Sequence, residues 1–290
     1  MHGFLNIDKP TGMTSHDVVA RVRKLARQKR VGHAGTLDPA ATGVLIVALG
    51  QATRLIEYVQ DETRKRYTAL VHLGVTTATD DAEGEVRETR PVPALSEQAI
   101  AAALVPFRGA IMQVPPIYSA LHHEGQRLYE LARAGQTVDI PARPVQVYRL
   151  DLLGLDLPDI TLDIECGKGT YIRSLARDLG AALGCGAHLA ALRRTAVGDF
   201  GIDTATPLAA LIDGTVALAA VLAPPEVAVR DWPVAPLDDQ QCAAIRNGRS
   251  LTLAIGGDRA VATTPDGTLL ALLQRDGDLW RPVKVFDWQS

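Results

Sequence analysis

Short runs of alternating hydrophobic and polar residues open the chain, and the period of each run predicts its structure. Phe4 to Asp8 alternates and stops at Lys9-Pro10-Thr11-Gly12, which predicts a strand followed by a turn. A helix follows, capped by Thr14 or Ser15, because apolar residues then recur at helical spacing: Val18, Val19, Val22, Leu25 and Ala26. The unbroken apolar run from Val44 to Leu49 is typical of a strand that is buried on both faces.

Predicted strands and helices continue to alternate along the chain. Further strands are predicted at 68–73, 144–152 and 161–166, and Val86 begins a return strand that forms a hairpin across the polar turn 79–84. That turn is acidic but lacks the EF-hand pattern, so we interpret it as solvated. Further helices are predicted at 52–60, 96–105 and 206–223, and Thr170 is expected to cap another one.

Two segments depart from this alternation. Residues 115–143 carry scattered basic and aromatic side chains without a period, which favours either an excursion that closes over a substrate or a surface insertion. Prolines at 224, 225, 233 and 236 mark a boundary, beyond which turn signals about every ten residues predict a small β-barrel-like module. The predicted domains are therefore 1–225 and 226–290.

Composition narrows the class of protein. The 290 residues are 47% hydrophobic and 22% charged, as in ordinary globular proteins, and the net charge of −3 gives no global sign of nucleic-acid binding. Cys166, Cys185 and Cys242 have neither disulfide nor zinc-ligand spacing, so a reduced cytoplasm fits best. No secretory signal is visible, and the apolar stretch 215–223 is too short to span a membrane. We expect a soluble, cytoplasmic protein.

Local charge tells more than net charge. Six cations without an acidic neighbour lie on and beyond the polar face of the first predicted helix: Arg21, Arg23, Lys24, Arg27, Lys29 and Arg30. A run of this kind is commonly a solvated helix face. Because this one leads into a glycine-rich loop and lacks counter-charges, it also suits a phosphate backbone.

The loop in question, 32–43, holds three glycines, one proline, one histidine and one aspartate. Its composition excludes a regular helix or a central strand. Asp38 precedes Pro39, so its backbone is extended and its carboxylate is presented from a fixed turn. The loop is either an ordinary turn or, with His33 and Asp38 ahead of a buried strand, a place for chemistry.

Six motifs carry a resemblance to a known family. In chain order they are NIDKPTGMTS at 6–15, GHAGTLDPAATGVL at 32–45, KRY at 65–67, PPIYSA at 115–120, GKGTYIR at 167–173 and HLAALRR at 188–194. In this order and spacing they resemble the TruB family of tRNA pseudouridine synthases, which act on uridine 55 of the T-loop. The resemblance covers about the first 200 residues, and the C-terminal tail is similar to the family's PUA-like appendage only loosely.

The resemblance implies a fold. The family has a mixed α/β (α+β) pseudouridine synthase fold, in which helices flank a largely antiparallel sheet. An inserted thumb fits residues 115–143, and the small C-terminal domain is expected to be β-rich and PUA-like.

The resemblance also implies the roles of individual residues. Asp38 matches the catalytic aspartate, and Arg173 matches the basic partner of that carboxylate. His33 matches the histidine of the same loop, which is associated with the flipped-out nucleotide. Lys9 and Pro10 match the N-terminal motif that supports the active-site loop.

Further matched residues are expected to contact the substrate. Tyr67 matches the tyrosine that stacks on the target base, and two more pocket contacts match Tyr171 and Leu192. The RNA backbone is expected to meet basic residues, namely Arg27, Lys29, Arg30 and Arg193. Taken alone, Tyr67 and Leu192 would be interpreted as core residues and Arg173 as a solvated cation.

The implied reaction suits these residue types. It breaks a C–N bond, turns the base and forms a C–C bond without redox change, so no metal or organic cofactor is expected. A carboxylate serves as nucleophile or stabilises positive character at the sugar carbon. The uridine is stacked within the T-loop and must be flipped out. The expected partner is the tRNA T-arm, with no membrane or protein partner and a monomeric chain.

Three alternative functions remain. The first is a protein of the same fold that acts on another RNA or depends on a guide; the intact motif set and the absence of long basic extensions disfavour a guide-dependent member. A tRNA-remodelling protein with secondary or lost catalysis has no need of Asp38 or Tyr67. A glycoside hydrolase would need a second carboxylate across the sugar, and the matched motifs offer none.

Overall fold

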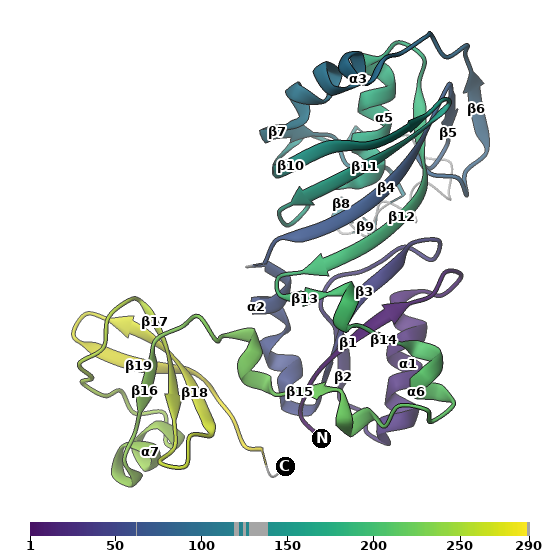
Figure 1. Cartoon of the computed structure of the whole chain (residues 1–290). Coiled ribbons are helices and arrows are strands. Elements are labelled where there is room, and N and C mark those ends of the chain that lie inside the picture. The colour runs from purple at the N-terminus through teal and green to yellow at the C-terminus, as the bar shows by residue number, and fades with distance from the viewer. Residues whose placement is uncertain (62, 119–121, 124–125, 128–138, 289–290) are drawn as a thin grey trace.

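A large lobe built on an 11-stranded sheet carries a small C-terminal lobe at its side (Figure 1). This computed structural model describes residues 1–61, 63–118, 122–123, 126–127 and 139–288. The mixed α/β class, the helices that flank the sheet and the β-rich C-terminal module confirm the predicted fold class. Within the described residues, no helix has the length and apolar character needed to cross a membrane.

The large sheet is mixed and largely antiparallel. Its main strand order is β14-β1-β3-β12-β4-β11-β10-β7, and among its described pairs only β1–β14 and β3–β12 are parallel. Its strands are β1 (Gly3–Lys9), β2 (Val31–His33), β3 (Thr42–Leu49), β4 (Lys65–Leu73), β7 (Gly109–Gln113), β10 (Arg143–Asp156), β11 (Asp159–Cys166), β12 (Ala187–Val197), β13 (Phe200–Gly201), β14 (Thr206–Pro207) and β15 (Leu222–Ala223). Two further ribbons pair β5 (Val75–Thr77) with β6 (Val86–Thr89) and β8 (His122–His123) with β9 (Gln126–Arg127).

Helices lie on both faces of this sheet. They are α1 (Ser15–Ala26), α2 (Ile56–Asp61), α3 (Glu97–Leu104), α5 (Ile172–Ala182) and α6 (Leu208–Ile212), with 3₁₀ turns η1 (Gly50–Leu55), η2 (Val105–Phe107), η3 (Ile202–Thr204), η4 (Leu218–Ala220) and η5 (Pro225–Ala228). Helices α1, α3, α5 and α6 pack on one face, and α2 with the 3₁₀ turn before it packs on the other. Side chains of α1 and α6 pack on β1 and β3, whereas those of α3 and α5 pack on β4 and β11. Leu192 of β12 packs against the core beneath α1 and α6 and also against the core beneath α3 and α5. It therefore lies on the sheet face that these four helices cover.

Strand β12 joins the two halves of the sheet. It pairs with β4 from Ala187 to Val197 but with β3 only at Arg193–Thr42 and Arg194–Gly43. At Gly43, φ is +99° and a Cβ would lie 2.2 Å from the Arg194 carbonyl oxygen. Glycine is therefore required where these strands meet.

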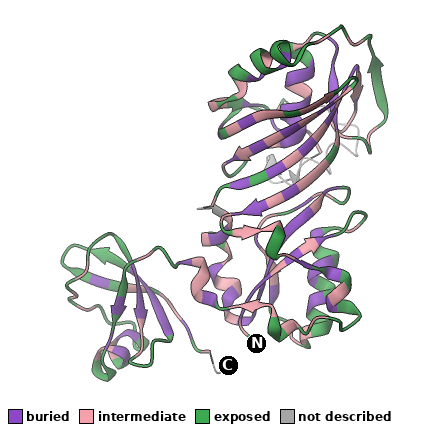
Figure 2. Ribbon diagram, viewed as in Figure 1, coloured by how far each residue is buried: buried purple, intermediate pink, exposed green. Residues whose placement is uncertain are grey.

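Local chemistry explains the first helix. Thr14 caps α1 and forms a capping box with Asp17, while Arg27 adopts the left-handed conformation that ends the helix. Every second residue of β4 is buried, as Figure 2 shows for the strands of this half. These elements and β1, β3, β10, β11 and α3 were predicted.

Other predictions were wrong. Helix α5 is not capped by Thr170: its N-cap is Tyr171, whose backbone exchanges two hydrogen bonds with the Gln113 side chain. The predicted helix 206–223 is divided into β14, α6, η4 and β15, because Gly214, with φ +80°, ends the helical turn. The predicted hairpin exists, but its strands are β5 and β6 rather than β4 and β6.

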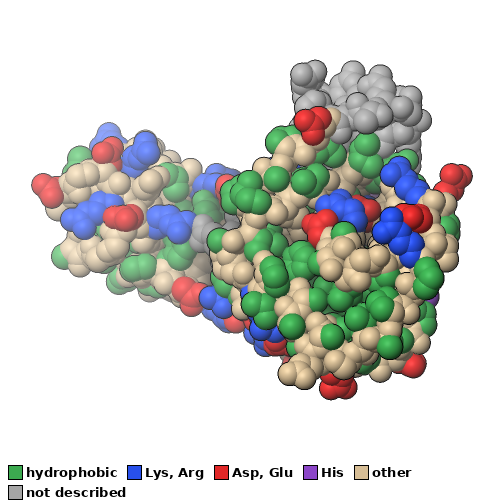
Figure 3. Space-filling view, turned by 90° about the horizontal axis from the view of Figure 1, so that it is seen from above, with side chains coloured by type: hydrophobic (Ala, Val, Ile, Leu, Met, Phe, Trp, Pro, Cys, Tyr) green, Lys and Arg blue, Asp and Glu red, His purple; other side chains and the backbone are tan. Residues whose placement is uncertain are grey.

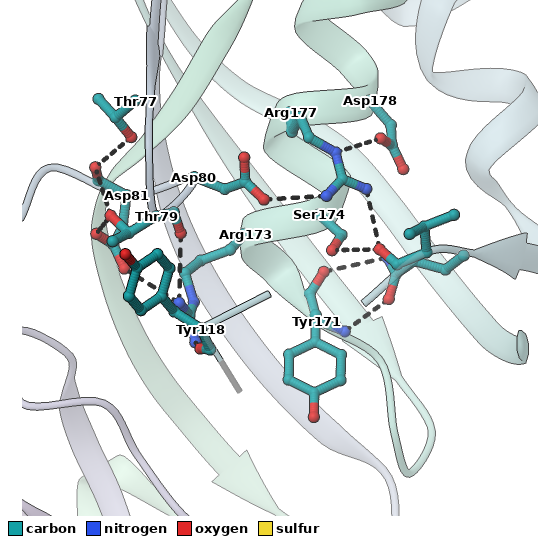
Figure 4. A network of polar contacts seen from close by, with 12 residues as sticks. Thr77, Thr79, Asp80, Asp81, Tyr118, Tyr171, Arg173, Ser174, Arg177 and Asp178 are labelled. Carbon is teal, nitrogen blue, oxygen red and sulfur yellow. Dashed lines mark hydrogen bonds and ion pairs between the residues drawn. The ribbon is translucent and has the colours of Figure 1, made fainter. Parts of the chain in front are cut away.

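The segment 115–143, predicted to be a thumb, begins and ends at neighbouring points of the sheet, because Gln113 of β7 pairs with Arg143 of β10. Most of that segment lies outside the described residues. Its first described residues, with Val114 before them, lie beside α5, to which the Val114 and Tyr118 carbonyls are hydrogen-bonded (Figure 4).

The C-terminal module has its own four-stranded sheet. It comprises β16 (Val234–Pro236), β17 (Arg259–Thr263), β18 (Leu269–Asp276), β19 (Leu279–Val285) and helix α7 (Asp239–Arg246), which enclose a core around Trp280. Lys284 of β19 forms an ion pair with Glu57 of α2, and Arg54 lies over the Phe286 ring at 4.9 Å. The predicted boundary at 225 falls within η5, ahead of this sheet, and stays a prediction.

Candidate active site

The loop that carries Asp38 connects β2 to β3, and Lys9 of β1 hydrogen-bonds to its backbone. The Lys9 ammonium is fully buried and donates to the carbonyl oxygens of Pro10 at 2.9 Å, Met13 at 2.7 Å and Pro39 at 3.1 Å. Burial lowers the pKa of Lys9, and the negative charge of Asp38 opposes that shift. Lys9 therefore contacts the loop at the backbone of Pro39, and the supporting role expected for Lys9 and Pro10 stays a prediction.

We expect Lys9→Met to destabilise the protein by about 2–4 kcal/mol, because three backbone carbonyl groups lose the buried donor that they share. Urea unfolding, followed by circular dichroism, measures this change. The control is Lys24→Met on the exposed face of α1, which should change stability by less than about 0.5 kcal/mol. Equal stability of the two variants would show that Lys9 does not hold the loop.

Arg194 holds the same loop from β12, and sequence reasoning missed it. Its side chain is 1% exposed and donates to the carbonyls of Gly35 at 3.2 Å, Thr36 at 3.3 Å and Val44 at 2.7 Å. It also hydrogen-bonds the phenol of Tyr67, its register partner on β4. The only signal in the sequence was the arginine pair in the motif 188–194.

Asp38 faces Arg173 across the gap between the two halves. An Nη2 atom of Arg173 lies 3.1 Å from the Asp38 Oδ2 atom, and the arginine side chain is 9% exposed while the aspartate is 42% exposed. The nearly buried guanidinium thus holds a carboxylate that still opens to solvent. This geometry brings together the two residues that the resemblance implied as the catalytic aspartate and its basic partner.

The acidic turn between β5 and β6 is solvated only in part: Glu83 is exposed, as predicted, but Asp80 and Asp81 are drawn into ion pairs. Asp81 Oδ2 lies 3.4 Å from Arg173 Nη1, and Asp80 Oδ2 lies 3.0 Å from Arg177 Nη1. Their side chains are only 15% and 17% exposed. Arg173 therefore bridges Asp38 and Asp81. Sequence reasoning missed Asp80 and Asp81 because their partners are remote in the chain; Figure 4 shows both aspartates beside Arg173 and Arg177.

The predicted pocket residues occupy three different elements, and their contact with a substrate stays a prediction. Tyr67 is 7% exposed, and burial raises its pKa, so its ring is held neutral beside Arg194. Leu192 is half-buried between the two cores. Tyr171 is half-buried at the start of α5, and its ring turns away from the contacts of Arg177 (Figure 4).

His33 lies at the end of β2 against His16 of α1, with their ring centroids 5.3 Å apart in an edge-on arrangement. Burial lowers the pKa of His33 below its usual 6.5, and the neighbouring His16 lowers it further. At neutral pH the ring is therefore uncharged. This property suits contact with an uncharged base better than contact with a phosphate.

This shift makes stability pH-dependent. The unfolded state takes up a proton on His33 near pH 6.5, whereas the folded state does so only at lower pH. The stability that the folded state gains from neutral His33 is therefore fully present above pH 6.5. It is lost as the pH falls through the lowered pKa of the folded state. We expect chemical unfolding of His33→Asn to show a shallower fall in stability below pH 6.5 than the wild type. Parallel curves would contradict the assignment, since all other histidines are common to both proteins.

The cations expected to contact RNA lie elsewhere. Arg193, next to Arg194 on β12, points to the opposite face of the sheet and donates to Asp8 Oδ2 at 2.8 Å. The structure does not bring it into the site. Arg27, Lys29 and Arg30 are exposed beyond the far end of α1, about 17 Å along its axis from the Thr14 cap. Their contact with RNA stays a prediction.

Acidic and basic side chains are intermixed over both lobes when the molecule is viewed from above (Figure 3). Among the described residues, no three His, Cys, Asp or Glu side chains gather as a metal site would require. The candidate site therefore consists of the open Asp38 carboxylate, its nearly buried partner Arg173, the neutral Tyr67 beside Arg194, and the apolar Leu192.

Family models match almost the whole chain. The model described as TruB family pseudouridylate synthase (N terminal domain) matches residues 23–172. The chain belongs to the TruB family. The tRNA pseudouridylate synthase B C-terminal domain matches 173–230, and the model of the tRNA Pseudouridine synthase II C terminus matches 232–287.

Full-length relatives support this membership. The tRNA pseudouridine synthase B of Mycobacteroides abscessus is 47% identical over 98% of this chain and 95% of its own length. That of Dehalococcoides mccartyi is 46% identical over 100% of this chain and 98% of its own length. Among solved structures, a chain of a Cbf5-Nop10-Gar1 complex is 30% identical, with a TM-score of 0.75 over 98% of this TruB family chain and 85% of that one. These relatives support pseudouridylation of tRNA.

Proposed function

We propose that this protein converts uridine 55 in the T-loop of tRNA to pseudouridine, with Asp38 as the catalytic residue. The observation that carries the proposal is the 3.1 Å contact between the open Asp38 carboxylate and the nearly buried Arg173. A charge-assisted pair of this kind holds a carboxylate in a fixed direction. The tRNA pseudouridine synthase B relatives supply the substrate class.

The reaction conserves atoms and needs no outside electrons. The bond between the sugar carbon and N1 breaks, the base turns, and a new bond forms between that carbon and C5. The C5 hydrogen leaves as a proton and N1 regains one. Asp38 acts on the ribose, as carboxylates do in glycosyl transfer.

The surroundings suit a base that has left its stack. Flipping brings uridine to protein groups and costs a few kcal/mol of unstacking. The neutral Tyr67 ring and the apolar Leu192 offer it a stacking surface and a dry wall, which keep the freed base from exchanging with solvent. Arg194 donates to the loop backbone and holds Tyr67 in place at the same time.

A T-arm stem-loop transcript tests the proposal. Incubated with the wild-type protein, it should gain pseudouridine at the single T-loop position, as mapped by carbodiimide treatment and primer extension. A transcript whose T-loop uridine is replaced by cytidine is the matched control and should gain none. Tight binding without product would favour a tRNA-remodelling protein, and product at another position would change the target.

The basic cluster beyond α1 is expected to contact the tRNA backbone. Replacing Arg27, Lys29 and Arg30 by alanine should lower the slope of log affinity against log salt by about two to three, one for each lost phosphate contact. Filter binding over a salt series measures this. A variant with Arg27→Lys and Arg30→Lys keeps the charge and should keep the slope. An unchanged slope in the alanine variant would place the RNA elsewhere.

A further inference from the structure

Arg177 lies one helical turn beyond Arg173 on α5, and the two arginines contact the same two segments of the chain. Arg173 donates to the carbonyls of Thr79 at 3.3 Å and Tyr118 at 3.0 Å. Arg177 donates to the Asp80 carboxylate at 3.0 Å and to the Val114 carbonyl at 2.9 Å. Each guanidinium thus joins the turn 79–81 to the segment 114–118 (Figure 4). Of the two, Arg173 is the one paired with Asp38.

All three nitrogens of the Arg177 guanidinium have partners. Besides the two contacts above, its Nε donates to Asp178 Oδ1 at 2.8 Å. Arg177 is 27% exposed and Asp80 is 17% exposed, so the pair is shielded from solvent more than an ordinary surface pair. Burial raises the pKa of Asp80, which means that its charge depends on the arginine beside it.

The turn needs this support. Asp80 has φ +61°, a left-handed conformation that costs a residue other than glycine about 1 kcal/mol. Its carbonyl accepts from Leu189 N at 3.0 Å, and Ala82 N donates to Leu189 O at 3.1 Å, so the turn is also fastened to β12. The carboxylate of Asp81, the next residue, is the second acid held by Arg173. A shift at Asp80 therefore moves a partner of Arg173.

The other segment is fastened to α5 in the same way. Ser174 Oγ donates to the Val114 carbonyl at 2.8 Å, and the Gln113 side chain exchanges two hydrogen bonds with the Tyr171 backbone. Arg177 adds a second donor to Val114. The Tyr118 carbonyl, four residues on, shares Arg173 Nη2 with Asp38. The direction of Arg173 is thus set by two segments that Arg177 holds.

We propose that Arg177, through its contacts with Asp80 and Val114, is a positioning residue that directs Arg173 toward Asp38. The inference rests on the proposed role of Asp38 but not on which uridine is converted. Arg177 acts on the rate of the bond-changing step rather than on tRNA binding, because it reaches the reacting groups only through Arg173.

Single-turnover kinetics with excess enzyme test this, since the rate constant does not depend on the fraction of active protein. Loss of tritium from tRNA made with [5-³H]uridine reports conversion at any position. We expect Arg177→Gln and Asp80→Asn each to lower the rate constant about tenfold, with tRNA affinity within about twofold of the wild type. The double variant should be no slower than the slower single one.

The matched control is the Arg149–Asp163 ion pair, whose partners lie 2.6 Å apart on neighbouring strands β10 and β11. Arg149→Gln and Asp163→Asn should leave the rate unchanged. Amide hydrogen exchange supplies a readout without substrate: in Arg177→Gln the amides of Ala82 and Leu189 should exchange faster, while core amides of β18 stay unchanged. Arg177→Lys should recover part of the rate.

Several results would overturn the proposal. They are an unchanged rate constant in Arg177→Gln, effects of the two single variants that add in the double variant, or a loss of affinity that equals the loss of rate. Unaltered exchange at Ala82 and Leu189 would also contradict it, even if the wild type converted no uridine. A wild-type protein that converts no uridine would instead contradict the proposed function. The failure of the proposed function can therefore be told apart from the failure of the role proposed for Arg177.

Discussion

Asp38→Asn should lower the rate of pseudouridine formation by at least about 10³-fold and leave the tRNA dissociation constant within about threefold. Asparagine has nearly the same shape and still accepts a hydrogen bond from Arg173, but it carries no negative charge. The reaction therefore loses the group that acts on the ribose, whereas the RNA-binding surface stays intact. Single-turnover tritium release and filter binding measure the two effects separately.

Asp163→Asn is the control for this variant. Asp163 is another partly exposed aspartate paired with an arginine, but its side chain lies on β11 beside Arg149 and makes no contact with the Asp38 loop among the described contacts. The single-turnover rate of Asp163→Asn should equal that of the wild type. A similar loss of rate and affinity in Asp38→Asn would mean that Asp38 only shapes the loop.

Arg173→Lys should lower the single-turnover rate about 10²-fold and the free energy of unfolding by about 1–3 kcal/mol. The two Nη atoms of Arg173 serve four acceptors on opposite sides, namely Asp38, Asp81 and the carbonyls of Thr79 and Tyr118. A lysine ammonium keeps the charge but is a single centre with three donors, so it cannot span them. The exposed fraction of Asp38 limits the loss of stability, because solvent stabilises its freed charge.

The control for Arg173→Lys is Arg66→Lys on β4. Arg66 is 53% exposed and lies 3.5 Å from Glu165, an arrangement of little energetic value. Rate and urea midpoint should both match the wild type. If Arg173→Lys also matched it, the fork geometry of the guanidinium would not matter and charge alone would suffice.

The helices and strands that are determined by residues close together in the sequence could be predicted. The Thr14–Asp17 capping box and the apolar spacing of α1 are local, as is the alternation of β1 and β11. The role of Asp38 came from the motif match, and its loop could be recognised because glycine and proline exclude other structures. Its pairing with Arg173 was implied by the family resemblance and has the expected geometry.

What could not be predicted depends on partners far along the chain. The cap of α5 is decided by Gln113, 58 residues before Tyr171. Asp80 is separated by 97 positions from Arg177, so its turn looked like any solvated acidic turn. Arg194 is buried because it meets the carbonyl of Val44, 150 residues earlier. Neither the composition of the chain nor the spacing of its hydrophobic residues indicates these long-range contacts.

The place of β12 in the sheet has a consequence for the order in which the protein is made. The strand that joins the two halves reaches across 150 residues to β3, so β3 and β4 emerge from the ribosome long before their shared neighbour. During that interval both strands present unpaired edges, which are prone to wrong pairing and aggregation. Neither the loop of Asp38 nor the ring of Tyr67 has its Arg194 support until then. The loop of Asp38 and the ring of Tyr67 thus gain their Arg194 contacts only after most of the large lobe has been made.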